Sequence, residues 1–359
     1  MLKTIKASEL LAKLDVKKIL PVFRKFFSRN SRYEKPLIKF FIWLKGRNPY
    51  QGWKELKANP KLARELGFAR IPSFSYIWYI INKKLKESGL EEIHSAIIKA
   101  CDVELEKRGE KFGESSSADA YPVEAWKNDL EAEYNGYYKK KVYLVHKLMC
   151  KKSGLCLAKI TTNGNEDEGK KLPFLMEKVS KIKIKVNELF ADNGYSSYEN
   201  YALLGNGGIK TYIKFRENSK YHWKGFLKIL RKRYKKAKKK LLLWEEIKKP
   251  KDFWERVLYA LNLAGDIEWV GEYYRNRSLR EFRKNPRAWN KKYYEGRNKI
   301  ENSNGQEKEQ LKIRLGPREK GLRKVKIKVE LAYISQAGFA LAKLQQGINS
   351  NLTSLAEIA

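Results

Sequence analysis

The sequence predicts an α/β protein in which helices flank a mixed sheet. A helical region comes before the sheet, and a mostly helical insertion interrupts it. Three observations support this. Apolar residues at helical spacing fill the first 110 residues, strand-length apolar segments alternate with helical ones over the next hundred, and helical spacing then returns. We expect four parts: an N-terminal helical domain, a first core part, an inserted basic helical subdomain, and a second core part with a C-terminal helix (1–110, 111–215, 216–290 and 291–359).

The first part is predicted to consist of short helices joined by tight turns. Ser8 is expected to cap the first helix, and Asn59 precedes a proline at the first position of another. Ser73 opens a segment that we expect to end at Gly89. Such an arrangement suits a DNA-binding or dimerisation module, and it equally suits a helical cap on the core.

The second part carries the predicted sheet. Its order is three strands, a helix, a strand, a helix and a strand. One carboxylate, Asp119, lies on the first strand, and another, Asp192, lies at the end of the fourth. This is a ribonuclease H-like layout, in which sites form at strand ends. The segments in order are 114–125, 141–150, 155–162, 168–180, 186–195, 197–205 and 208–215.

The charge of the chain points to a polyanionic partner. Lys and Arg number 77 against 41 acids, giving a formal charge of +36 over 359 residues. A compact protein repels itself at that charge, so nucleic acid is the expected partner. No apolar run of about 18 residues is present, so no membrane span is expected. The three cysteines form no disulfide or zinc spacing, which indicates a reducing cytoplasm.

The inserted region concentrates this charge. Eight of the ten residues in 231–240 are basic, and we expect them to contact DNA phosphates. The five tryptophans between residues 223 and 289 are expected to pack in a core rather than to stack on bases. The side chains selected as phosphate contacts are Arg231, Lys232, Arg233, Lys235 and Lys236.

One short stretch near the C-terminal end gives the sharpest signal. Tyr294, Arg297, Glu301 and Lys308 follow one another at steps of three, four and seven residues, which places them on one face of a helix. A carboxylate between two cations and a phenol, on a strongly basic protein, indicates a site for phosphate and metal.

Phosphoryl transfer on nucleic acid fits a set of carboxylates. Two divalent ions can activate the attacking oxygen and stabilise the leaving oxygen, and Mg²⁺ prefers oxygen ligands. Three carboxylates are the minimal set, and position selects Asp119, Asp192 and Glu301. Only a fold could gather residues so far apart in the sequence.

Other acidic residues compete for these roles. Asp102 lies in a helical segment near the first strand, and Asp129 lies in a charged loop. Glu281 follows a tyrosine and an arginine at the same steps as Glu301, but the seventh residue after it is Ala288 rather than lysine. A simple surface pair within the helix of Glu301 is the plainest alternative to a catalytic role.

These motifs resemble the DDE transposases of bacterial and archaeal insertion sequences. The spacing from Tyr294 to Lys308 is similar to the Y-(2)-R-(3)-E-(6)-K signature of that family. The likeness covers roughly 114–218 and 291–345. The upstream segments that resemble the family are 117–125, 137–179 and 190–218.

The resemblance implies a transposase with a ribonuclease H-like core. It implies two Mg²⁺ ions, which Mn²⁺ can replace, held by Asp119, Asp192 and Glu301, with endonuclease cleavage at transposon ends and strand transfer by the freed 3′-hydroxyl. It also implies DNA with terminal inverted repeats, target DNA, a dimer in the synaptic complex, and a prokaryotic cytoplasm with nucleoid association. The residues expected to contact phosphates near the cut are Tyr294, Arg297 and Lys308.

Two other functions stay open on the sequence. A structure-specific nuclease on the same core would cut without joining. A non-catalytic, domesticated DNA-binding protein would bind in a salt-sensitive manner without metal. The family often has an aspartate or histidine in a loop after the third strand, and Asp167 has no assigned role here. The helical insertion also departs from relatives with a β-rich one.

Overall fold

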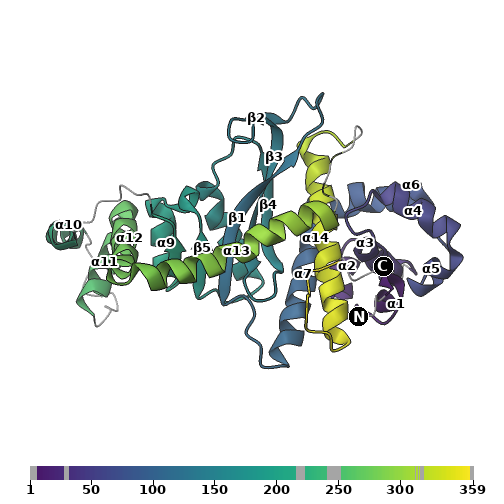
Figure 1. Cartoon of the computed structure of the whole chain (residues 1–359), viewed down its shortest axis with the longest axis horizontal. Helices are drawn as coiled ribbons and strands as arrows, with labels where there is room; N and C mark the ends of the chain where they lie inside the picture. The colour runs from purple at the N-terminus through teal and green to yellow at the C-terminus, as the bar shows by residue number, and fades with distance from the viewer. Residues whose placement is uncertain are drawn as a thin grey trace. The chain divides into compact units, whose positions relative to one another are not determined.

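The computed structural model describes residues 6–27, 32–215, 223–240, 252–311, 313, 315 and 319–355 (Figure 1). The chain divides into two compact units. The first comprises 1–166, 174–185 and 298–359, and the second comprises 167–173 and 186–297.

Antiparallel strands form the sheet of the first unit. β3 (Lys140–Cys150) pairs with β1 (Ser115–Glu124), with β4 (Cys156–Asn163) and with the short β2 (Glu133–Asn135). The register places Asp119 of β1 opposite Lys147 of β3, and Lys147 opposite Lys159 of β4. Directly opposed residues point to the same face, so these three polar side chains form a row across the sheet.

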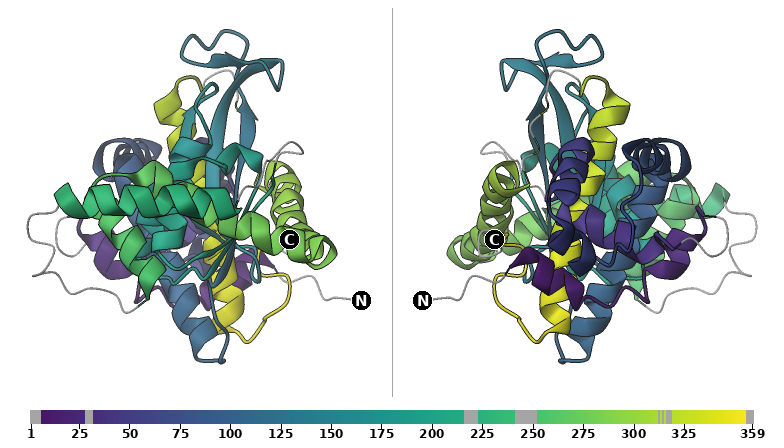
Figure 2. Two further views of the ribbon diagram at one scale, coloured as in Figure 1. Left: turned by 90° about the vertical axis from the view of Figure 1, so that its left-hand side faces the viewer. Right: turned by 90° about the vertical axis from the view of Figure 1, so that its right-hand side faces the viewer.

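Two long helices pack together in the first unit. α7 (Lys86–Glu106) and α14 (Leu322–Gln345) lie side by side (Figures 1 and 2). α14 also contacts β4. Nearly every residue of α14 from Val329 onward is buried, and α14 confirms the helix expected near the C-terminal end. The other helices with residues in this unit are α1 (Ala7–Ala12), α2 (Leu20–Arg24), α3 (Glu34–Trp43), α4 (Pro49–Ala58), α5 (Pro60–Glu65), α6 (Phe74–Tyr79), the π-helical η1 (Ile80–Leu85) and α8 (Leu172–Lys181).

The helix boundaries test the predicted caps. The Asn59 side chain accepts from the backbone N–H of Leu62 at 3.0 Å, and Ser73 caps α6, so both caps are confirmed. The prediction that Ser8 caps the first helix was wrong, because Ser8 lies inside α1. The helix end at Gly89 was also wrong: Gly89 lies within α7, where a Cβ would come within 3.0 Å of the Phe26 ring. A glycine is needed at this position because α7 packs closely on Phe26, and it does not mark the end of a helix.

The second unit contains a parallel strand pair. β5 (Glu188–Ala191) pairs with β6 (Lys210–Ile213), and α9 (Tyr198–Asn206) connects them. α12 (Ile267–Lys284) packs on α9. A Cβ on Gly205 would lie 2.2 Å from the Tyr274 ring, so the two helices can approach this closely only with glycine there. α13 (Pro286–Gln310) contacts Phe190 of β5 in the same way, through Gly296.

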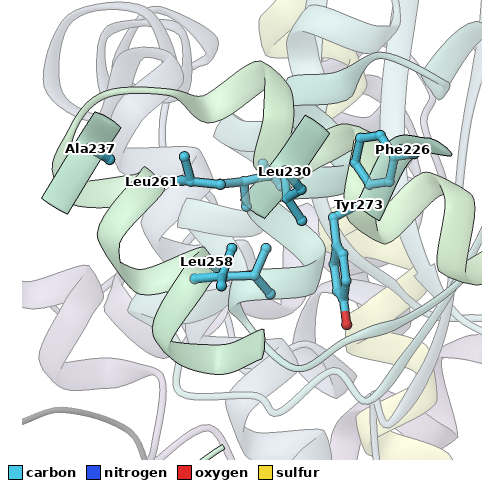
Figure 3. Close-up of a cluster of buried hydrophobic side chains, with 9 residues drawn as sticks. Phe226, Leu230, Ala237, Leu258, Leu261 and Tyr273 are labelled. Atoms are coloured by element: carbon cyan, nitrogen blue, oxygen red, sulfur yellow. The ribbon is translucent and has the colours of Figure 1, made fainter. Parts of the chain in front are cut away.

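The described part of the insertion is helical, as expected. α10 (Trp223–Lys240), α11 (Phe253–Leu263) and α12 bury a shared apolar cluster (Figure 3). Trp223, Trp254 and Trp269 pack against this cluster, which agrees with a core role for them. Trp244 lies outside the described residues, as does the Gly316-Pro317 pair, at which the sequence indicates a break after the segment that carries Glu301.

The pairing confirms the predicted fold class. Antiparallel strands in the first unit and parallel strands in the second give a mixed sheet, and helices flank it, as in a ribonuclease H-like α/β fold. The prediction missed β2, because three residues are too few to show an apolar period.

Candidate active site

A hydrogen bond joins the first candidate carboxylate to helix α13. Asp119 lies in the middle of β1 and its side chain is 7% exposed. The amide Nδ2 of Asn304, on α13, donates to Asp119 Oδ2 at 2.7 Å. This distance is at the short end of the range for N–H···O hydrogen bonds. The bond fixes both the carboxylate and the rotation of the helix above it.

A second contact anchors the same turn of α13. Lys147, opposite Asp119 on β3, is 0% exposed, and its Nζ donates to Ser303 Oγ at 3.2 Å. The ammonium also lies 5.4 Å from the centre of the Tyr121 ring, which stabilises a desolvated cation. Two adjacent residues of α13 are therefore bonded to two adjacent strands.

These hydrogen bonds position α13, the helix that carries Glu301, with respect to Asp119. Glu301 precedes Asn304 by three residues, about 4.5 Å along the helix axis, and lies on the same helical face. The Glu301 side chain is exposed. Sequence reasoning selected Glu301 but missed Asn304 and Lys147. Nothing local marks Asn304, because its role arises from Asp119, which is 185 residues away in the sequence.

The other signature residues are also on α13. The Tyr294 side chain is 51% exposed, whereas Arg297 is only 7% exposed. Lys308 lies in α13, but its side chain is outside the described residues.

Asp192 is held by a turn in the second unit. It directly follows β5, and its Oδ1 accepts the backbone N–H of Gly194 at 2.9 Å, which caps the 3-10 turn η3 (Asn193–Tyr195). Asn200 ties this turn to the preceding loop, because its Nδ2 donates to the carbonyls of Tyr195 at 3.1 Å and Gly169 at 2.9 Å. The half-buried Asp192 carboxylate is thus fixed by backbone contacts.

The loop before α8 carries two more carboxylates, Asp167 and Glu168. Asp167 Oδ1 accepts the backbone N–H of Gly169 at 2.8 Å, so Asp167 has a turn-forming contact. Glu168 was missed by sequence reasoning. Its Oε2 and Asp192 Oδ1 both lie within 3.5 Å of the position that a Cβ on Gly194 would occupy.

The competing acids have other contacts. Asp129 is buried, and its Oδ2 accepts from the Tyr143 hydroxyl at 2.9 Å and the Gly321 N–H at 3.0 Å, which makes it structural. Glu281 forms an ion pair with Lys210 at 3.4 Å. Asp102 lies on α7, and burial raises its pKa above the ordinary value.

The donor set near Asp119 fits a hard divalent ion. Among the described residues, Asn304 Oδ1 is buried without a hydrogen-bond donor, and an amide oxygen beside a carboxylate is a ligand type that Mg²⁺ accepts. No three His, Cys, Asp or Glu side chains within the described ranges form a complete metal site. Asp119 and Glu301 belong to the first unit, and Asp192 belongs to the second.

Comparison with known proteins adds one match. The model of the transposase DDE domain family matches residues 111–325, a span that contains β1, β5 and the whole of α13. Neither the curated proteins nor the solved structures compared with the chain gave a match. No described helix is both long and apolar enough to span a bilayer. Because the matched span exceeds half of the 359 residues, the chain belongs to the transposase DDE domain family.

Proposed function

We propose that this protein is a DNA transposase that cuts at terminal inverted repeats and joins the freed 3′-hydroxyl to target DNA. The observation that carries the proposal is the hydrogen bond from Asn304 to Asp119. It docks the helix that carries Glu301 on the strand that carries Asp119, within a domain of the transposase family.

The proposed cofactor is a pair of Mg²⁺ ions, with Mn²⁺ as a substitute, held by Asp119, Asp192 and Glu301. Divalent ions are usual in this family. When bound, such ions activate the attacking oxygen and stabilise the leaving oxygen. The protein contributes orientation: Asn304 fixes the Asp119 carboxylate, and the Gly194 N–H fixes that of Asp192.

Tyr294, Arg297 and Lys308 are proposed to contact the DNA backbone near the cut. All three lie on α13 together with Glu301. An arginine can bind a phosphate through two parallel hydrogen bonds, which holds the strand in register. The exposed Tyr294 ring offers a face for a sugar or base.

The basic face of α10 is proposed as a second backbone contact. Its buried side contributes to the insertion core, whereas Lys232, Lys235 and Lys236 are exposed. Arg231 lies 5.6 Å from the centre of the Trp254 ring, and Arg233 lies 4.7 Å from that of Trp269. The rings orient the guanidinium groups, and the lysines supply mobile charge for phosphates.

The N-terminal region is proposed to take part in DNA binding or in dimerisation. Tyr50, Trp78 and Tyr79 expose more than 40% of their surface, and Lys54 lies 4.6 Å from the centre of the Tyr50 ring. Exposed aromatic side chains beside lysines suit nucleic acid. Because two DNA ends must be held together, we expect a dimer in the synaptic complex.

The decisive test replaces each carboxylate singly. Asp119→Ala, Asp192→Ala and Glu301→Ala should abolish Mg²⁺-dependent cleavage of DNA carrying the terminal repeats. The matched control Glu281→Ala, from the near-repeat on α12, should leave cleavage intact. Cleavage that survives all three substitutions would refute the assignment.

A strand-transfer assay separates the alternative functions. Joined products identify a transposase, and cutting without joining identifies a nuclease. Salt-sensitive binding with no metal-dependent reaction would indicate a non-catalytic DNA-binding protein. Either of the last two results would overturn the proposed function.

A further inference from the structure

A polar pocket of about 300 Å³ lies beside the catalytic helix in the first unit. We call it the hairpin pocket. Its walls are the β3–β4 hairpin (151–154), residues 302 and 303 of α13, the segment after α7, and residues 349–353 near the C-terminal end. Asn302 and Ser303 directly follow Glu301, so the pocket adjoins the helical turn that carries the third candidate carboxylate.

The pocket is held by bonds that do not depend on a ligand. Gly154 has a φ of +76°, and a Cβ there would lie 3.1 Å from Thr353 Oγ1, so the hairpin packs directly on the C-terminal segment. The buried Lys343 ammonium ties that segment down, because its Nζ donates to the carbonyls of Asn351 and Ser354 at 2.8 Å each. A preformed pocket needs little ordering when a ligand binds.

The charged residues that line the pocket favour an anionic ligand. Three lysines line the pocket, Lys111, Lys151 and Lys152, against one carboxylate, Glu110. Lys152 pairs with Glu110 at 2.7 Å, but the lysine side chain is 64% exposed. Exposed ion pairs of this kind contribute little to stability, so a phosphate can replace the Glu110 carboxylate as the partner of the Lys152 ammonium. The volume admits a phosphate with its sugar, but it is too small for a duplex.

The register relates the pocket to the candidate cut. Cys150, at the base of the hairpin, pairs with Ser116, which lies three residues before Asp119 on β1. Three strand residues span about 10 Å. Along the axis of B-form DNA, where each strand carries one phosphate per 3.4 Å, this distance is the rise of about three nucleotides. A strand crossing Asp119 can therefore reach the pocket without a large distortion.

We propose that the hairpin pocket binds one backbone phosphate of the DNA strand, about three nucleotides from the phosphate that is cut. This inference rests on the proposed function for the position of the cut. The ammonium groups of Lys151 and Lys152 neutralise the phosphate, and the side-chain amides and hydroxyls of the pocket orient its oxygens.

The test combines a protein change with a DNA change. Terminal-repeat duplexes carry a neutral methylphosphonate at one position at a time. Binding is measured without metal, with Asp119→Asn as the parent protein, so that the result does not require cleavage. At one position the neutral group should weaken binding about tenfold, the value of one charge-assisted hydrogen bond. That penalty should vanish when Lys151→Ala/Lys152→Ala is added.

The control pair Lys57→Ala/Lys61→Ala, from exposed lysines of α4 and α5, should keep the position-dependent penalty. If the Lys151→Ala/Lys152→Ala variant shows the same loss of binding as its parent at every methylphosphonate position, the proposal is wrong. Inorganic phosphate distinguishes the other source of this ligand. If millimolar phosphate, compared with chloride at equal ionic strength, removed the penalty, the pocket would be a free-phosphate site and the proposal would fall. A cleavage assay that failed in the unsubstituted protein would instead refute the proposed function.

Discussion

Replacing Asn304 by alanine should weaken Mg²⁺ binding, so that the reaction requires a higher Mg²⁺ concentration. The substitution removes the 2.7 Å hydrogen bond to Asp119 and the amide oxygen beside it. A hydrogen bond to a charged group contributes about 1.5–3 kcal/mol, which corresponds to roughly a tenfold to hundredfold change in an equilibrium constant. Loss of a side chain that orients a metal-binding carboxylate has effects of the same size. We therefore expect the half-saturating Mg²⁺ concentration for cleavage to rise by about that factor.

The assay has a second readout and a matched control. Ca²⁺, added without DNA, should raise the unfolding temperature of the unsubstituted protein more than that of Asn304→Ala. Asn298→Ala changes an exposed asparagine on the same helix and should match the unsubstituted protein in both measurements. If Asn304→Ala required no more Mg²⁺ than Asn298→Ala, the assignment of Asn304 as a positioning residue would be wrong.

Three further predictions concern stability. Gly205→Ala should lower the free energy of unfolding by about 1–3 kcal/mol in a urea titration, because its Cβ would meet the Tyr274 ring at 2.2 Å. Lys159→Met should cost about 3–5 kcal/mol by leaving Glu330 uncompensated, whereas adding Glu330→Leu should restore most of the loss, since the pair at 2.8 Å is buried. Burial and two nearby lysines hold the pKa of His94 well below 6.5. The unfolded chain binds a proton there as the pH falls below that value and the folded chain does not, so stability falls toward about pH 5. His94→Phe should flatten this slope, as urea midpoints at several pH values will show.

Local signals were enough to predict most elements of the core. The strands on either side of the hairpin at 151–154 were found because apolar segments of strand length flank a Lys-Ser-Gly turn. Gly89 misled the prediction, because its role is to make room for Phe26 and only the tertiary structure shows that contact. Asn304 was missed because an asparagine within a helix carries no local signal, and its role arises from Asp119, which is 185 residues away.

The near-repeat on α12 shows how one spacing can serve two purposes. Tyr274 packs its ring on Gly205 of α9, and Glu281 pairs with Lys210 of β6. Both contacts stabilise the second unit. Tyr294, at the equivalent place on α13, is exposed. The tyrosine, arginine and glutamate spacing therefore describes a helical face and does not by itself identify a catalytic one.

The residues that follow the glutamate distinguish the helical face of Glu281 on α12 from that of Glu301 on α13. Three positions after Glu281 comes Lys284, and three after Glu301 comes Asn304. An ammonium offers only donors and would compete with a cation for a carboxylate, whereas an amide can hold that carboxylate and still present an oxygen. Seven positions on, Ala288 stands where α13 has Lys308. A face that binds both a metal ion and a phosphate needs an oxygen ligand close to the glutamate and a cation farther along. Of these two helices, α13 has both residue types at that spacing, which supports the proposal that Glu301, and not Glu281, is the third carboxylate.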